Sequence, residues 1–318
     1  MTDGTKEKST TKFGDIRDQL DIKAPGDHLI RATGYNGGVR AMALRLDQSV
    51  ADLSRRLELS PAGAGLLGEL LAAAAFLGAD LKNEDAYLSM TCRSEGFVRQ
   101  ICAVCNAHLE LKGSLIGNDR CEVALDGDRV HPERLLEQVQ MNVIKYLGRK
   151  DGGYTGTVEH PNGQIGTLFV TYLNQSEQRR SFVTFGLTYE KGQLKGVGAL
   201  FAEPMPDCDP ERLESFIARA EHFPALSSLM DEFTPDQWLD LLLGDPEIQY
   251  LERRPLRYHC PCSAERFSRS LLTLGASELE TLAKDPQGIH IRCEFCGRHY
   301  HFSPEELLKL KEESLGKA

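Results

Sequence analysis

The chain has 318 residues, which is enough for two domains and a sizeable hydrophobic core. With 41% hydrophobic and 26% charged residues, its composition is that of a globular protein. The formal net charge of −10 disfavours a general nucleic-acid-binding protein, because contacts with phosphate groups need a basic surface.

Nine cysteines are too few for a secreted scaffold built from disulfides. Their clustering points instead to metal or redox chemistry in a reducing compartment. The N-terminal residues are polar and charged and contain no apolar segment typical of a secretory signal. We therefore expect a cytoplasmic protein.

Residues 1–26 contain few large apolar side chains and are predicted to form a disordered leader. Apolar patterning from Leu29 to Leu44 around Gly37-Gly38 predicts a β-hairpin, and residues 47–57 have helical spacing. Ser60 and Pro61 are typical of a helix start.

The helix that follows is the only candidate for a membrane span. Residues 62–79 are almost long enough to cross a bilayer, but they are mostly small and include Glu69. We favour a buried helix that packs against a sheet, and we expect no membrane partner.

The stretch up to residue 206 mixes strands and helices without a regular βαβ period. It is predicted to be one α+β domain, residues 27–206. Strands are expected between residues 87 and 126 and at residues 154–158, 182–189 and 192–201, and helices at residues 132–147 and 166–176.

Residues 207–256 form a run of short amphipathic helices in the prediction. Asp209-Pro210 opens one helix, and a capping box beginning at Thr234 opens another that ends at Gly244. Short helices are marginal alone and need a surface on which to dock. We therefore interpret this segment as a metastable linker.

The last block, residues 257–318, contains Cys260 and Cys262, followed 30 residues later by Cys293 and Cys296. Helices are predicted at residues 263–274 and 277–283, strands at 289–292 and 299–302, and a final helix from 304 to about 310. Each cysteine pair can present two sulfurs from one tight turn. Two such turns together make a tetrahedral thiolate site, for which zinc is the usual metal.

These four cysteines fill a tetrahedron, so His259, His290, His299 and His301 are expected beside the metal rather than on it. A closed four-sulfur site has no open coordination position, which disfavours zinc-dependent hydrolysis. The same sulfurs can oxidise, and oxidation that ejects zinc would unfold a module that zinc stabilises. The spacing alone leaves open a structural site or a redox switch.

Cys102 and Cys105 form a second C-x-x-C pair in a strand-like stretch, with Cys92 and Cys121 nearby. A thioredoxin-type redox pair is one interpretation, but we favour buried structural cysteines, since free Cys packs as a small apolar residue. Cys208 has no assigned role. The sequence contains no phosphate-binding loop, nucleophile elbow or H-E-x-x-H motif, so neither ATP use nor enzymatic activity is expected.

The cysteine pattern, with Gly-Arg-His-Tyr after Cys296, resembles the C-terminal signature of the 33 kDa chaperonin (heat shock protein 33) family. Residues 27–31, 60–80, 154–156 and 172–178 also resemble family segments, so the resemblance covers about residues 27–310. The leader and the pair Cys102 and Cys105 depart from the pattern.

The resemblance implies one Zn²⁺ per chain in a reduced, inactive form, bound by Cys260, Cys262, Cys293 and Cys296. It implies that oxidation forms the disulfides Cys260–Cys262 and Cys293–Cys296, releases zinc and unfolds the linker. The resemblance implies that the apolar surface exposed in this way holds unfolding client proteins without ATP under oxidative stress, with residues 27–206 as the client-binding domain. It also suggests that the active form is a homodimer. A constitutive zinc-ribbon adaptor and a thiol oxidoreductase that uses Cys102 and Cys105 are the alternatives.

Overall fold

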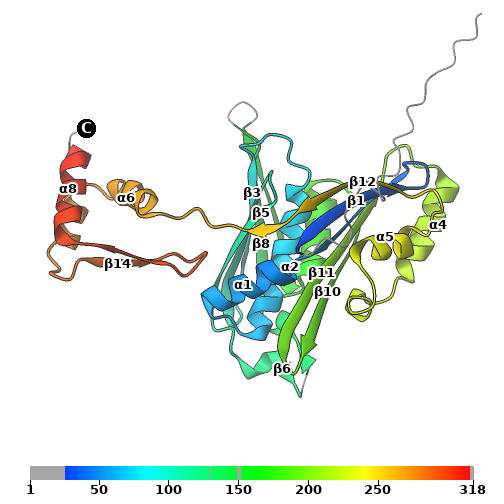
Figure 1. Cartoon of the computed structure of the whole chain (residues 1–318), viewed down its shortest axis with the longest axis horizontal. Helices are drawn as coiled ribbons and strands as arrows, with labels where there is room; N and C mark the ends of the chain where they lie inside the picture. The colour runs from blue at the N-terminus through cyan, green and yellow to red at the C-terminus, as the bar shows by residue number, and fades with distance from the viewer. Residues whose placement is uncertain (1–25, 128, 149–151, 316–318) are drawn as a thin grey trace, which may run out of the picture.

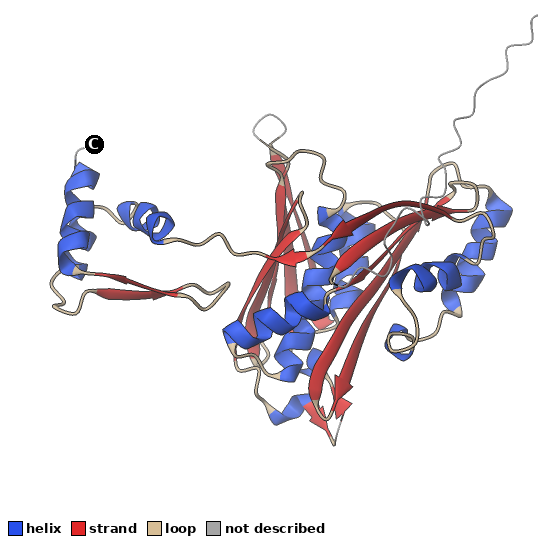
Figure 2. Cartoon of the chain, in the orientation of Figure 1, coloured by secondary structure: helices blue, strands red, loops and turns tan. Residues whose placement is uncertain are grey.

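The computed structural model describes residues 26–127, 129–148 and 152–315. Two largely antiparallel sheets stand on either side of the central helix α2, as Figures 1 and 2 show. Short helices cover the far face of one sheet, and a C-terminal module stands away from this body at the end of an extended segment (Figure 1). The predicted leader, apart from its last residue, lies outside the described residues.

The five-stranded sheet has apolar side chains on both faces. Leu29 and Met42 face α2, whereas Ile30 and Ala43 face the helices on the other side. This explains why the predicted hairpin appears as a nearly continuous apolar run. The strand order is β10 (Phe182–Glu190), β11 (Gln193–Pro204), β2 (Val39–Arg45), β1 (His28–Gly34) and β12 (Gln249–Pro255).

The six-stranded sheet is buried on one face only. Its inner side chains pack on α2, and its outer side chains alternate with them along each strand. The order is β13 (Arg257–Tyr258), β5 (Glu110–Gly117), β4 (Val98–Asn106), β3 (Tyr87–Arg93), β8 (Glu137–Tyr146) and β9 (Gly153–Asn162). The other elements beside it are β6 (Leu125–Asp126), β7 (Arg129–Val130), η1 (Glu122–Ala124) and η2 (Pro132–Leu135).

Helix α2 (Pro61–Gly78) is the centre of the core. The Ser60 hydroxyl accepts a hydrogen bond from the Gly63 amide at 3.0 Å, as predicted for an N-cap. The helix is long and apolar enough to cross a membrane, yet 89% of its 18-residue window is buried within the protein. Small residues bring the sheets close, since a Cβ at Gly68 would lie 2.9 Å from Val197. These are the properties of a core helix. Helices α1 (Asp47–Leu57) and α3 (Ile165–Ser176) flank it.

The helix predicted at residues 132–147 is wrong. After the short turn η2, the chain forms strand β8, which lies between β3 and the edge strand β9 in the six-stranded sheet. Val139, Met141 and Val143 alternate with partly exposed residues, which is the period of a half-buried strand. Leu135, Leu136 and Val139 also match helical spacing, but pairing with β3 and β9 outweighs that local pattern.

The predicted linker begins with helices and ends in a strand. Helices α4 (Pro210–Glu221) and α5 (Pro235–Leu243), with the turn η3 (Leu226–Ser228), pack on the far face of the five-stranded sheet. Residues 249–255, expected to be helical, instead form β12, which pairs with β1 along the sheet edge. Edge pairing with β1 is a long-range contact that the spacing of this segment does not encode.

Charged side chains join the end of α2 to both edges of the five-stranded sheet. Arg40 pairs with Asp80 at 2.9 Å, and Arg179 pairs with Glu203 at 2.7 Å. Arg31 of β1 pairs with Glu252 of β12 at 3.2 Å. These carboxylates are mostly enclosed by the protein and each is paired with an arginine.

The C-terminal module has a small core of its own. Leu279, Phe302 and Leu307 lie in this core. The Ser303 hydroxyl accepts from the Glu306 amide at 3.3 Å, and the last helix extends beyond the predicted end. Its elements are α6 (Ala264–Leu272), α7 (Ala276–Leu282), β14 (Ile289–Arg292), β15 (His299–Phe302) and α8 (Pro304–Leu315).

Candidate metal centre

Two backbone segments bring the four C-terminal cysteines together. Cys260 and Cys262 lie in the extended segment between β13 and α6, and Cys293 and Cys296 lie in the turn between β14 and β15. In that turn the amides of Cys296 and Gly297 donate to the Cys293 carbonyl at 3.3 and 2.8 Å. Gly297 has a φ of 70°, which favours glycine and closes the turn.

The four sulfurs form one compact cluster. They lie within 4.8 Å of one another, with 3.8 Å between the sulfurs of Cys260 and Cys293 and 3.2 Å between those of Cys262 and Cys296. Zn–S bonds of about 2.3 Å place the sulfurs of a tetrahedral site about 3.8 Å apart. The cluster therefore has the size and the soft donor atoms of a four-sulfur metal site.

All nine cysteines lie in the described part of the chain, and all are free thiols. No disulfide joins the four cysteines of the predicted cluster. The metal-binding group found among the described residues consists of these four sulfurs, and no histidine belongs to it. Instead, the ring of His301 contacts the Gln287 carbonyl at 2.8 Å and stacks on His290 at 4.6 Å between ring centroids.

Tyr300 contacts the cluster from β15. Its hydroxyl donates to the Cys262 sulfur at 3.0 Å. Burial opposes ionisation of Cys262, but hydrogen bonds from Tyr300 and the neighbouring thiols lower its pKa to about 7. Burial and the nearby charge of Cys293 raise the pKa of Cys260. The sulfurs therefore differ in how readily each becomes a thiolate, the form that binds metals and reacts with oxidants.

The sequence did not single out Tyr300 as a hydrogen-bond donor to sulfur. It also missed Tyr258, whose hydroxyl donates to the Phe295 carbonyl at 2.8 Å. The sequence feature that could have indicated either tyrosine is its position, because each lies two to four residues from a cysteine of the cluster. The hydrogen-bond acceptor of each tyrosine hydroxyl lies 37 or 38 residues away in the sequence, so only the folded structure identifies it.

Cys102 and Cys105 point to opposite faces of strand β4. Cys105 is buried against α2, whereas Cys102 is on the outer face, as their three-residue separation on a strand requires. Burial raises the pKa of Cys105 to about 12, and burial also raises the pKa of Cys92 and Cys102. This arrangement disfavours a thioredoxin-type pair. Cys121 and Cys208 are partly exposed and lie elsewhere.

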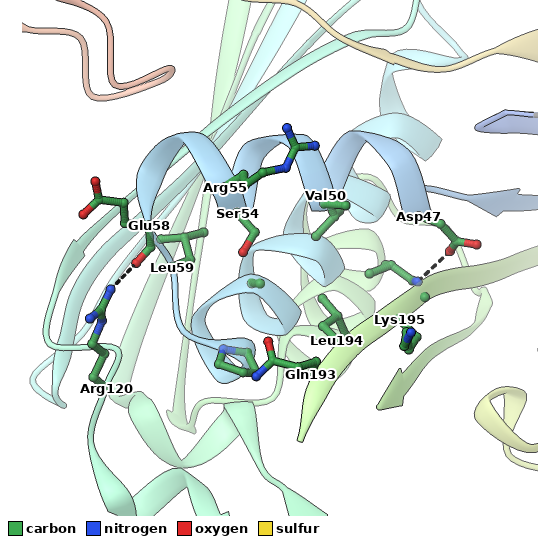
Figure 3. Close-up of a pocket in the computed structure, with 15 residues that line it drawn as sticks. Asp47, Val50, Ser54, Arg55, Glu58, Leu59, Arg120, Gln193, Leu194 and Lys195 are labelled. Carbon is green, nitrogen blue, oxygen red and sulfur yellow. Dashed lines mark hydrogen bonds between the residues drawn. The ribbon is translucent and has the colours of Figure 1, made fainter. Parts of the chain in front are cut away.

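A cavity of about 370 Å³ lies beside α1 and the β10–β11 hairpin (Figure 3). Most of its charged side chains have partners within the protein. The Asp47 carboxylate accepts from the Val197 amide at 2.9 Å, and Arg120 donates to the Glu58 carbonyl at 2.8 Å, as the dashed lines in Figure 3 mark. Lys195 pairs with Glu190 at 2.7 Å. We find no arrangement of a nucleophile with a base among these lining residues.

Comparison with known proteins extends over nearly the whole chain. The family model described as Hsp33 protein matches residues 27–303. The 33 kDa chaperonin of Enterococcus faecalis is 30% identical over 293 residues, which cover 91% of this chain and 97% of that protein. The 33 kDa chaperonin of Bacillus subtilis is 32% identical over 293 residues, covering 91% and 99%.

The fold also matches a solved structure. The crystal structure of the 33 kDa chaperonin from Thermotoga maritima aligns with a TM-score of 0.81 at 23% sequence identity. The alignment covers 92% of this chain and 100% of that chain. Body and C-terminal module are thus an architecture that this chain shares with that protein.

Proposed function

Because this chain belongs to the Hsp33 family, we propose that it is a redox-regulated chaperone that holds unfolding proteins without ATP. The observation that carries the proposal is the four-sulfur cluster, which lies directly after the strand that ends the linker. We place its activity in the cytoplasm under oxidative stress. Its partners are unfolding client proteins and, when oxidised, a second copy of the chain, with no nucleic acid or membrane partner.

In the reduced protein, Cys260, Cys262, Cys293 and Cys296 would bind one Zn²⁺, since their sulfurs match a tetrahedral site. When bound, zinc would hold the two turns together and offset the charge of the thiolates. Arg298, which lies next to the cluster, would offset more of that charge. In this state the linker helices stay on the sheet and the protein is inactive.

Oxidation forms the disulfides Cys260–Cys262 and Cys293–Cys296 in this proposal. In each pair two thiolates give up two electrons and form one S–S bond, while one hydrogen peroxide molecule takes up the two electrons and two protons from solvent and becomes two water molecules. Disulfide sulfurs no longer bind the metal. Pairing within each turn leaves the two turns unconnected, whereas a bond between Cys262 and Cys296 would join them, so only the first pairing opens the module.

Opening of the module then releases the linker. Helices α4 and α5 are short and depend on apolar contacts, with Trp238, Leu239 and Leu242 fully buried on the five-stranded sheet. Their departure would expose both the sheet face and their own apolar sides. Such a surface binds unfolded segments through the hydrophobic effect and needs no nucleotide. We infer that the protein is a chaperone and not an enzyme.

The proposal is tested by the aggregation of a heat-labile client protein. Peroxide-treated, zinc-depleted protein should suppress aggregation, whereas reduced, zinc-loaded protein should not. Equal protection by both forms would exclude the redox switch. Zinc that stays bound to the protein under mild oxidant, with thiol loss measured on the same sample, would favour a constitutive zinc-ribbon adaptor instead. Cys102→Ser with Cys105→Ser should leave the activity unchanged, which would exclude the thiol oxidoreductase.

A further inference from the structure

The segment that precedes the cluster is attached to both sheets of the body. Residues 249–259, called the strap here, pair with β1 through β12 and with β5 through β13. The amide of Leu256 donates to the Asp27 carbonyl at 2.9 Å, and the amide of His259 donates to the Leu111 carbonyl at 2.8 Å. The next residue is Cys260. The strap is therefore the covalent connection between the sulfur cluster and the linker helices α4 and α5.

The turn at residues 293–297 touches the body at the end of this strap. The Lys112 ammonium of β5 lies 4.7 Å from the centre of the Phe295 ring, a cation–π contact. The Phe295 carbonyl accepts from the Tyr258 hydroxyl at 2.8 Å, and the Arg56 guanidinium of α1 lies 5.6 Å from the Tyr258 ring. These four side chains are called the docking contact.

At the docking contact the backbone of the turn also lies close to the backbone of the body. A Cβ at Gly297 would lie only 2.4 Å from the Arg56 carbonyl, so glycine allows the turn to sit against the end of α1. The rest of the C-terminal module stands away from the body (Figure 1). A small contact therefore joins the two parts.

We propose that the outer face of β5 and the end of α1 are the docking surface for the metal-binding turn of this chain, and that this contact keeps the strap on both sheets. Phe295 lies between Cys293 and Cys296, so the shape of the turn depends on how those two sulfurs are bound. A turn reshaped by their disulfide no longer presents the Phe295 ring to Lys112 and its carbonyl to Tyr258. The strap then loses its support next to Cys260.

This inference rests on the proposed function and names the contact through which the cluster acts on the linker. It predicts that the contact can be broken while the metal stays bound. Lys112→Met is the most direct change, because Lys112 is on the body, far in sequence from the cysteines, and Met keeps the length of the side chain without its charge. Lys195→Met, which removes a lysine from the β10–β11 hairpin, is the matched control.

The experiment is hydrogen exchange of the Leu256 and His259 amides in the reduced, zinc-loaded full chain, with zinc content measured on the same sample. Lys112→Met should bind one zinc per chain, exchange these amides about two- to fivefold faster than wild type, and hold more client than wild type without oxidant. Lys195→Met should match wild type. Phe295→Ala, a second variant of the contact, should show the same faster exchange.

Wild-type exchange rates in zinc-loaded Lys112→Met and Phe295→Ala would overturn the docking contact. This outcome differs from a failure of the proposed function, in which oxidised wild-type protein holds no client. Amide exchange in the strap tests the contact in either case, since it needs no client.

Discussion

Tyr300 contacts the four-sulfur cluster through a hydroxyl group that donates to Cys262. Tyr300→Phe removes this donor but keeps the ring that stacks on Phe267. One hydrogen bond to a charged group contributes about 1.5 kcal/mol, or about one pKa unit. We expect the alkylation of Cys262 to shift to higher pH by about that amount, measured by mass spectrometry of the peptide in reduced, metal-free protein whose C-terminal module is first shown by circular dichroism to remain folded.

Tyr258→Phe is the control for this change, because the Tyr258 hydroxyl donates to the Phe295 carbonyl and not to sulfur. Its Cys262 profile should stay near that of the wild type. An unchanged profile in Tyr300→Phe would show that this hydrogen bond does not stabilise the Cys262 thiolate.

Glu69 is a carboxyl group on the core helix. Burial, together with the charge of Glu133, raises its pKa to about 8 from the ordinary value of 4.5. A carboxyl group with a raised pKa in the folded state stabilises the fold at low pH, and this contribution is lost as the pH rises from 4.5 towards 8. Each pKa unit corresponds to about 1.4 kcal/mol.

Glu69→Gln should therefore be more stable than the wild type at pH 8.5 by about 2 kcal/mol or more, with a difference that shrinks towards pH 5. Urea unfolding in reductant at both pH values measures this. A stability difference for Glu69→Gln that does not change with pH would contradict the raised pKa.

At the scale of single elements, α5 shows how the linker is held. Trp238 is fully buried on the five-stranded sheet, whereas Leu241 on the opposite side of the helix is exposed. Trp238→Ala removes a large buried side chain, a change that typically costs about 3–5 kcal/mol. We expect protease cleavage within residues 207–248 of the reduced protein and client holding without oxidant. Leu241→Ala is the control and should resist cleavage like the wild type. Resistance of Trp238→Ala to cleavage would contradict the view that the linker helices are only marginally stable.

Local signals predicted the elements whose spacing and caps agree with the fold. Ser60 and the box at Thr234 mark real helix starts, and the paired cysteines are brought together as their spacing indicates. Residues 137–146 were misassigned because their apolar positions match a strand and, in part, a helix. Pairing with β3 and β9 decides between the two, and no local pattern contains that information.

The same limit applies to the candidate site. The four sulfurs are visible in sequence because each pair is local. The contacts that attach the cluster to the body join Lys112 and Arg56 to residues far along the chain, so no local pattern predicts them. Likewise, β12 and the paired acids Asp80 and Glu203 depend on which strands become neighbours.

At the scale of the whole molecule, the account joins three parts: a cluster of thiols, a strap on both sheets, and linker helices that cover apolar surface. Trp238 is the only tryptophan in the chain and lies in the linker. Its fluorescence therefore reports release of α5 from the sheet. Zinc release can be followed in the same sample with a chromogenic chelator.

The decisive measurement is the time course of both signals after peroxide is added to reduced, zinc-loaded protein. The account predicts release of one zinc per chain and a red shift of Trp238 emission with the same half-time or directly after it. Complete zinc release with Trp238 still buried, or exposure of Trp238 while zinc stays bound, would contradict the claim that the sulfur cluster controls the linker.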